Sequence, residues 1–207
     1  MPYTKHKGID ASHWDGNPDV DMHLAKSSGI DFWFEKATDG LSIDPTFKKR
    51  QPRVRATFDV RGWYHFCHCD GIDPIKQGEF FSKTIGILTK KEYAVFDIEA
   101  GWGSLTGANG IDYAIKMIEA FKSHSGAKDD QIIIYGSLGW LRGQFGKDLA
   151  RLNMFHLWAA RYGVSVLGDT SPWSAALIWQ SSENATVPGV ANGYADLDYW
   201  LDDHWAV

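Results

Sequence analysis

Short apolar segments alternate with helical patterns in this chain up to about residue 155. Between the first five apolar segments, hydrophobic residues recur at helical spacing, most clearly over 111–122, where a helix is predicted that ends at Ser125-Gly126. Strands that alternate with helices are expected to run parallel in one sheet. The predicted strands cover 8–12, 32–36, 60–67, 93–99, 131–135, 155–160, 175–180 and 194–198.

The helical patterns fade after residue 155. Loops rich in Gly, Ser and Pro join the later strands, as at 168–172. We therefore predict an α/β fold, a modified TIM-like barrel with five β/α units followed by about three β-strands that lack helices. A chain of 207 residues suits a single domain over 1–207, most simply a monomer.

The charge of the chain argues against a nucleic-acid partner. The formal net charge is −5, and no basic stripe is present to displace counterions from phosphates. The densest basic cluster falls on a predicted helix and is interpreted as its solvated face; it comprises Lys48, Lys49, Arg50, Arg53 and Arg55. No apolar run approaches the ~20 residues of a membrane span, which predicts no membrane insertion. The start of the chain has no apolar signal region, which predicts synthesis in the cytosol without a signal peptide.

Two cysteines, Cys67 and Cys69, lie one residue apart on a predicted strand. This separation is ill suited to a mutual disulfide. His65 shares their strand face, so a metal site is conceivable, but a fourth ligand is not evident. We therefore predict no metal and no cofactor.

Two carboxylates follow the apolar strand that begins at Tyr93. Side chains alternate along a strand, so Asp97 and Glu99 are expected to point the same way, while Ile98 points to the opposite face. Two like charges that are close together and partly sheltered from water cannot both ionise freely, so one of them can stay protonated near neutral pH. A protonated carboxyl beside an ionised one is the pair that glycosidases use to cut an acetal bond.

Polar residues also follow the other predicted strands. Because the ends of parallel strands meet at one mouth of a barrel, these residues are expected to surround a common site. They are Asp10, Lys36, Thr38, Tyr64, His65, Tyr135, Trp158, Arg161, Tyr162, Gln180 and Asp196. Some of the ten Trp residues are expected to line this cleft and most to fill the core.

Nine short stretches, in the same order along the chain, resemble the Chalaropsis-type lysozymes of glycoside hydrolase family 25. They lie at 8–14, 36–40, 44–47, 62–66, 96–99, 133–135, 157–162, 178–180 and 195–198. The resemblance implies a barrel and hydrolysis of the β-1,4 bond between N-acetylmuramic acid and N-acetylglucosamine in bacterial peptidoglycan. It also implies that no cofactor is used.

The resemblance assigns expected roles to individual residues. Glu99 resembles the general acid and Asp97 its assisting neighbour, while Asp10 and Asp196 match the other two acids of the cleft. The residues expected to bind substrate are Lys36, Tyr64, Tyr135, Trp158, Tyr162 and Gln180. Retaining, inverting and substrate-assisted routes all stay open at this point.

Three places depart from the family pattern, and one of them is Cys67-His68-Cys69, which replaces the usual polar loop. Glu35 replaces an apolar or small residue, and we interpret it as a salt-bridged side chain facing the helices, with an added acid near the cleft as the alternative. Asp198 replaces a common Asn, and this change is expected to matter little.

Other function classes are weighed against a lysozyme. A chitinase-like enzyme is disfavoured because its longer acidic motif is missing, and an inactive peptidoglycan-binding barrel because all four acids are present. An amidase or peptidase would need a zinc triad or a nucleophilic Cys-His pair. The expected setting is a phage endolysin that reaches the wall after holin-type release or lysis, as one catalytic domain without a separate cell-wall-binding domain.

Overall fold

The computed structural model describes residues 6–15, 20–99, 101–190 and 195–201. Its centre is a closed barrel in which the sheet order is β1-β9-β8-β7-β6-β5-β4-β2 and pairing of β1 with β2 closes the ring. The short strand β3 (Ser42–Ile43) extends β2 as a hairpin. The barrel strands are β1 (His6–Ala11), β2 (Phe32–Asp39), β4 (Val60–Phe66), β5 (Glu92–Asp97), β6 (Ile132–Ser137), β7 (His156–Ala160), β8 (Ile178–Ala185) and β9 (Ala195–Trp200).

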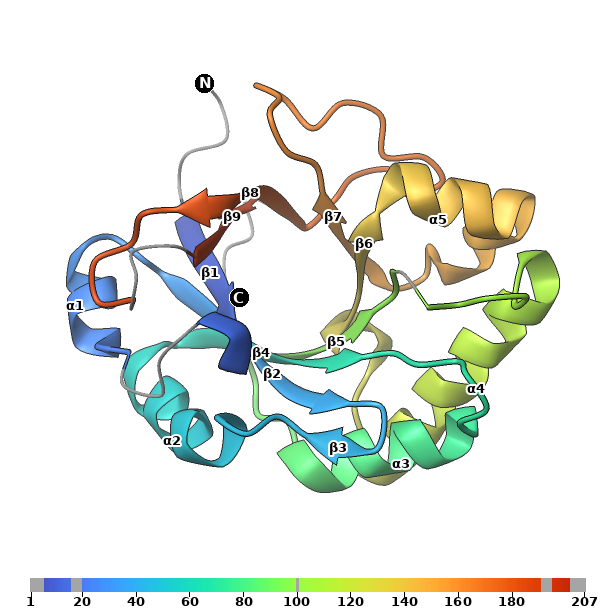
Figure 1. The fold of residues 1–207 in the computed structure, drawn as a ribbon, viewed down its shortest axis with the longest axis horizontal. Helices are drawn as coiled ribbons and strands as arrows, with labels where there is room; N and C mark the ends of the chain where they lie inside the picture. The colour runs from blue at the N-terminus through green and yellow to red at the C-terminus, as the bar shows by residue number, and fades with distance from the viewer. Residues whose placement is uncertain (1–5, 16–19, 100, 191–194, 202–207) are drawn as a thin grey trace.

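Helices follow the first five barrel strands, and none follows β7, β8 or β9 in the described part of the chain (Figure 1). The predicted barrel of five β/α units and three further strands is therefore confirmed. Among the described residues, no helix is both long and apolar enough to cross a membrane. The helices are α1 (Met22–Ser27), α2 (Phe47–Thr57), α3 (Pro74–Ile85), α4 (Gly107–Ser125) and α5 (Leu138–Phe145), with short 3-10 turns η1 (His13–Asp15), η2 (Asp129–Gln131) and η3 (Gly146–Leu152).

Local sequence signals set the ends of these helices. The Asp73 side chain accepts hydrogen bonds from the first free amides of α3, and Pro74 occupies the first turn, where no amide hydrogen is needed. Helix α4 ends at Gly126, whose φ of 68° lies in the left-handed region. The helix predicted over 111–122 is thus confirmed and extended at both ends.

The core has two layers, one inside the barrel and one between the barrel and the helices. Along β2, Phe32 and Phe34 point into the barrel and Trp33 points outward. A β-carbon at Gly8 would lie 2.1 Å from the Phe32 ring, and one at Gly62 would lie 2.0 Å from the Phe34 ring. Glycines on the flanking strands therefore make room for two phenyl rings in a narrow interior.

Glu35 forms a buried ion pair with Arg50, at 3.0 Å between Oε1 and Nη1. Both side chains have no exposed surface. Trp33 Nε1 and Thr46 Oγ1 also donate to Glu35, and Arg50 Nη1 donates to the carbonyl of Ser12. The interpretation of Glu35 as a salt-bridged residue is confirmed.

The predicted solvated face of α2 is wrong in part. Arg50 is buried against Glu35, and Arg55 Nε donates to Glu92 Oε1 at 2.8 Å. The cluster therefore includes both buried and exposed residues, because one face of α2 packs on the barrel, where β2 carries the buried Glu35. Lys48 on the same helix is exposed, as expected.

Arg50→Met is expected to destabilise the fold by about 3–5 kcal/mol at neutral pH, because it leaves the Glu35 carboxylate buried without its cation. Burial raises the pKa of Glu35 to about 7 from 4.5, and Arg50 opposes this shift. The folded chain therefore binds more protons than the unfolded chain in this window, so stability falls as the pH rises through it. Removing Arg50 should steepen that fall. Urea unfolding at pH 5 and pH 7.5, with the exposed Lys48→Met as the control, measures the effect; equal losses at both values would contradict it.

Cys67 and Cys69 do not lie on a strand, contrary to the prediction, because β4 ends at Phe66. Both are free thiols; Cys67 is buried, and Cys69 Sγ donates to the Gly101 carbonyl. The neighbouring His65 ring is fixed between Thr38 Oγ1 and Gln77 Oε1, and burial lowers its pKa to about 3. No group of three or more His, Cys, Asp or Glu side chains is arranged to hold a metal ion in the described ranges.

Candidate active site

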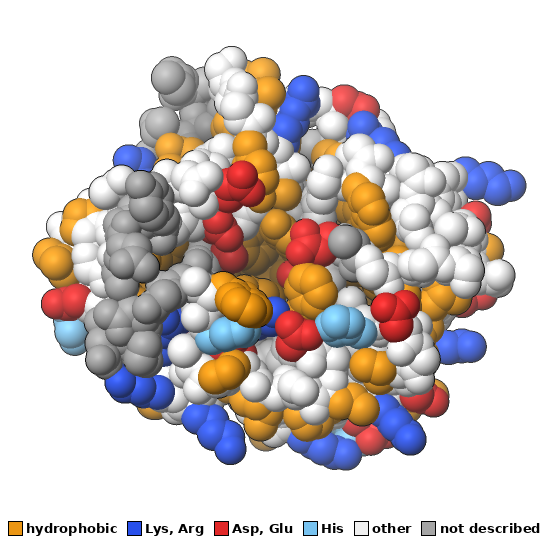
Figure 2. Space-filling view, in the orientation of Figure 1, with side chains coloured by type: hydrophobic (Ala, Val, Ile, Leu, Met, Phe, Trp, Pro, Cys, Tyr) orange, Lys and Arg blue, Asp and Glu red, His pale blue; other side chains and the backbone are white. Residues whose placement is uncertain are grey.

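One mouth of the barrel opens into a pocket with acidic walls. Figure 2 shows a hollow in the middle of this face, with Asp and Glu side chains around it. Eight of the residues predicted from sequence lie in its lining, and they come from seven strands and the residues directly after them. The lining residues are Asp10, Ser12, Trp14, Lys36, Asp39, Tyr64, Phe66, Val95, Asp97, Glu99, Tyr135, Trp158 and Asp196.

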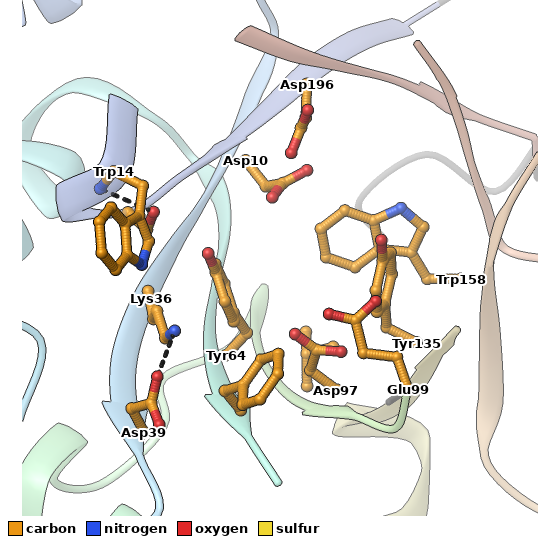
Figure 3. A pocket seen from close by; sticks show the side chains of 13 residues that line it. Asp10, Trp14, Lys36, Asp39, Tyr64, Asp97, Glu99, Tyr135, Trp158 and Asp196 are labelled. Atoms are coloured by element: carbon orange, nitrogen blue, oxygen red, sulfur yellow. Dashed lines mark hydrogen bonds and ion pairs between the residues drawn. The ribbon is translucent and has the colours of Figure 1, made fainter. Parts of the chain in front are cut away.

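Asp97 and Glu99 lie side by side in the pocket (Figure 3). Asp97 is the last residue of β5, and the Ile98 amide continues the pairing by donating to the Tyr135 carbonyl. Ile98 itself is buried in the outer core layer. The strand alternation therefore persists beyond Asp97 and brings both carboxyl groups to the same face.

The two carboxyl groups titrate as an interacting pair. Burial raises the pKa of Asp97 well above its ordinary value, and the nearby Glu99 charge adds to the shift. Burial also raises the pKa of Glu99, while Lys36 acts in the opposite direction. The pair consequently keeps a proton at a pH where two separate carboxyls in water would have lost theirs. Glu99 is the more exposed member and can deliver that proton into the pocket.

Asp10 and Asp196 face the pocket from adjacent strands. The prediction placed Asp196 at the exit of a parallel strand, and this is wrong, because β9 runs antiparallel to both of its neighbours. The start of β9 therefore lies at the mouth where the other strands end. The register pairs Asp10 directly with Asp196, and Figure 3 shows both carboxyl groups at one side of the pocket, across from Asp97 and Glu99.

Gln180 lies behind Asp10 rather than in the pocket lining. Its Nε2 donates to Asp10 Oδ2 at 2.7 Å. The hydroxyls of Tyr135 and Tyr162 both donate to its Oε1, at 2.7 and 2.5 Å. Two donors on the oxygen fix the amide orientation, so that the NH2 group faces the carboxylate. Gln180 and Tyr162 therefore act on the pocket through Asp10 and Tyr135.

A β-bulge in β2 decides which polar residues face the pocket from that strand. The register with β4 shifts between Lys36 and Thr38. Asp39 consequently faces the pocket and binds Lys36, at 2.6 Å between Oδ2 and Nζ. Thr38 was predicted at the mouth, but it faces the outer layer and binds His65. An extra residue in one strand inverts the side-chain alternation beyond it.

Sequence reasoning missed five lining residues, namely Ser12, Trp14, Asp39, Phe66 and Val95. Trp14 is the most informative, because its side chain is 78% exposed while it lines the pocket. Its amide donates to Ser12 Oγ, and its ring lies 4.3 Å from that of His13. An exposed indole at the rim offers a flat apolar face of the kind that sugar rings stack on. Its position three residues after the end of β1 is the signal that the sequence offers.

The arrangement suits hydrolysis of an acetal. A coupled carboxyl pair supplies an acid, two further carboxylates stand opposite it, and aromatic side chains form the walls. A barrel that carries its site at the carboxyl ends of the strands, with a carboxyl pair as the reactive groups, has the architecture of a glycoside hydrolase.

Comparison with known proteins agrees with this class. The model of the glycosyl hydrolases family 25 matches residues 9–190, so the chain belongs to that family. It is 28% identical over 193 residues to the "Autolytic lysozyme" of Clostridium acetobutylicum; the match covers 93% of this chain and 55% of the relative, so the chain spans about half the length of that protein.

Solved structures show the same fold. The bacterial lysozyme from Streptomyces coelicolor has a TM-score of 0.84 at 24% identity, over 96% of this chain and 94% of that one. A family 25 glycosyl hydrolase from Bacillus anthracis has a TM-score of 0.80 at 22% identity, over 98% and 91% of the two chains.

Proposed function

We propose that this chain is a lysozyme that hydrolyses the β-1,4 bond between N-acetylmuramic acid and N-acetylglucosamine in bacterial peptidoglycan. The observation that carries the proposal is the coupled pair of Asp97 and Glu99 at the open mouth of a family 25 barrel. Release of soluble fragments from purified peptidoglycan by the wild-type chain is the basic test. A folded chain that releases nothing would instead favour an inactive binding barrel.

Glu99 is assigned the role of general acid in this proposal. Its raised pKa keeps the proton available, and its position in the pocket gives access to the oxygen that links the two sugars. Transfer of the proton to that oxygen lets the leaving sugar depart as an alcohol while positive charge develops on the other ring. The carboxylates opposite, Asp10 and Asp196, stabilise that charge or position water.

Asp97 is assigned to the substrate's 2-acetamido group. Its Oδ1 is buried and has no hydrogen-bond partner among the described residues, although its side chain is 6% exposed in the pocket. The part of Asp97 that reaches the pocket is therefore the rest of its carboxyl group, beside Glu99. A substrate acetamide N–H that donates to the exposed part of this carboxylate is held with its oxygen toward the anomeric carbon, which is the substrate-assisted route.

Activity is expected to follow a bell-shaped pH profile with an optimum on the acidic side of neutral. Glu99 must be protonated, and because its folded pKa is raised, activity should be lost only as the pH rises through that higher value. Below the optimum, protonation of Asp10 and Asp196 removes the negative charge that stabilises the positive charge on the sugar ring. Initial rates on labelled peptidoglycan between pH 3 and pH 10 test this. A rate that climbs steadily to pH 9 would point to a thiolate or a metal hydroxide instead.

The substrate itself is the only partner that the proposal requires. Action as a monomer, and delivery to the wall by holin-type release or lysis, stay predictions.

A further inference from the structure

Asp198 lies behind the pocket in an unusual environment for an acid. It sits on β9 between Gly8 of β1 and Gln180 of β8, and its side chain has no exposed surface. Trp158 Nε1 donates to its Oδ1 at 2.9 Å. Its Oδ2 is also buried. Among the described residues, no amide, hydroxyl, indole or cationic group donates a hydrogen bond to it. A fully ionised Asp198 would therefore keep one charged oxygen unsatisfied.

The neighbour that can satisfy this oxygen is itself an acid. The side chains of Asp198 and Asp10 are within hydrogen-bond reach of each other. Asp10 lies on β1 two residues along from Gly8, which pairs with Asp198, and it already accepts Gln180 Nε2 on Oδ2. Ionised carboxylates only accept hydrogen bonds. A hydrogen bond between these two residues therefore requires one proton on the pair.

We propose that Asp10 and Asp198 share one proton, so that Asp198 acts as a positioning residue that holds Asp10 in the pocket wall. The shared proton and the Gln180 amide then hold Asp10 from two sides, at a site where it is 8% exposed. The pair carries one negative charge rather than two. The catalytic consequence of this arrangement rests on the proposed function, whereas the shared proton does not.

The charges around the pair favour retention of the proton. Burial raises the pKa of Asp198 well above its ordinary value, and the nearby Asp196 on the same strand raises it further. Asp10 faces Asp198 from β1, whereas the groups that face it from β7 and β8 are the neutral side chains of Trp158 and Gln180. Three carboxyl groups thus meet on adjacent strands, and the most buried of them is the one whose ionisation costs most.

Carbon-13 NMR of the aspartate carboxyl groups tests the shared proton directly in the wild-type protein. Asp10 and Asp198 are expected to titrate together, with one proton retained by the pair at pH 6. Both carboxyl signals should move again at a higher pH, where that proton leaves. Two independent titrations near the ordinary aspartate value of about 3.9, with both groups ionised at pH 6, would overturn the proposal.

Two substitutions test the positioning role. Asp198→Asn keeps an acceptor for Trp158 and supplies an N–H for Asp10, so its turnover should stay close to the wild-type value. Asp10 should then titrate in a single step at low pH. Asp198→Leu keeps the branching of the side chain at a larger volume and supplies neither a donor for Asp10 nor an acceptor for Trp158, so kcat should fall by at least about tenfold with little change in KM. Equal loss of kcat in both variants would overturn the role of the proton.

Thermal stability separates this inference from the proposed function. The folded wild-type pair binds a proton that the unfolded aspartates release, so wild-type stability should fall as the pH rises above about 4. Asp198→Asn lacks this proton, so the Tm of the variant minus the Tm of the wild type should increase as the pH rises. A Tm difference that does not change with pH would contradict the shared proton. Loss of peptidoglycan cleavage with an intact NMR titration would contradict only the function.

Discussion

Glu99→Gln is expected to lower the rate of peptidoglycan hydrolysis by about 10²–10⁴-fold while the fold stays intact. The amide keeps the shape of the side chain but has no acidic proton to give to the leaving oxygen. The glutamine does not titrate, so the residual activity should no longer decline at the high pH where the wild-type Glu99 loses its proton. Release of labelled fragments, with the circular dichroism spectrum as the check on folding, measures the effect.

Glu119→Gln is the matched control, because Glu119 is a half-exposed glutamate on α4 outside the pocket lining. It should hydrolyse peptidoglycan at the wild-type rate. A Glu99→Gln variant that keeps more than about a tenth of the wild-type rate would remove Glu99 from the role of general acid.

Asp97→Asn is expected to lower turnover by about 10²–10³-fold, comparable to the loss of a group that stabilises charge in a transition state. The carboxyl group of Asp97 reaches the pocket beside Glu99, and an asparagine there cannot stabilise the positive charge that builds on the acetamide group as it attacks the anomeric carbon. Glycan whose muramic acid has lost its N-acetyl group should accordingly be cut poorly by the wild-type enzyme, even where it binds.

The anomeric configuration of the first product separates the routes. The substrate-assisted route retains the configuration, whereas direct attack by water inverts it. Normal turnover of de-N-acetylated glycan with an inverted product, observed by NMR, would move Asp97 out of this role. Water activated by a carboxylate such as Asp10 or Asp196 would then be favoured.

Much of the fold was predictable because it follows from local periodicity. The alternation of apolar strands and helices gave the barrel, and the two-residue strand period correctly brought Asp97 and Glu99 to one face. The strand-end rule likewise brought Lys36, Tyr64 and Tyr135 to the pocket. These inferences need only the backbone geometry of single strands and the closure of a parallel sheet.

The missed features depend on residues that are distant in sequence. The bulge at Ala37 turns Asp39 rather than Thr38 toward the pocket. It is set by the register with β4, and the residues of β2 alone do not predict it. The antiparallel direction of β9 is the exception, because only nine residues join it to β8, and a parallel crossover needs a dozen or more. The burial of Arg50 against Glu35 joins a helix to a strand across 15 positions.

Asp198 illustrates the same limit within the site. The resemblance suggested that its departure from Asn matters little, and nothing in its immediate neighbours contradicts this. Its environment becomes visible only when β1, β7, β8 and β9 are brought together, since Trp158 and Asp10 contact it from different strands.

The most direct test of the proposed function is the identity of the sugar at each new reducing end. Purified peptidoglycan is digested with the enzyme, reduced with borohydride and hydrolysed, and the reduced sugars are identified by mass spectrometry. The account predicts reduced muramic acid, formed by the wild-type chain and strongly diminished with Glu99→Gln. Reduced glucosamine would contradict it and identify a chitinase-like N-acetylglucosaminidase. New amino groups without new reducing ends would instead identify an amidase or peptidase.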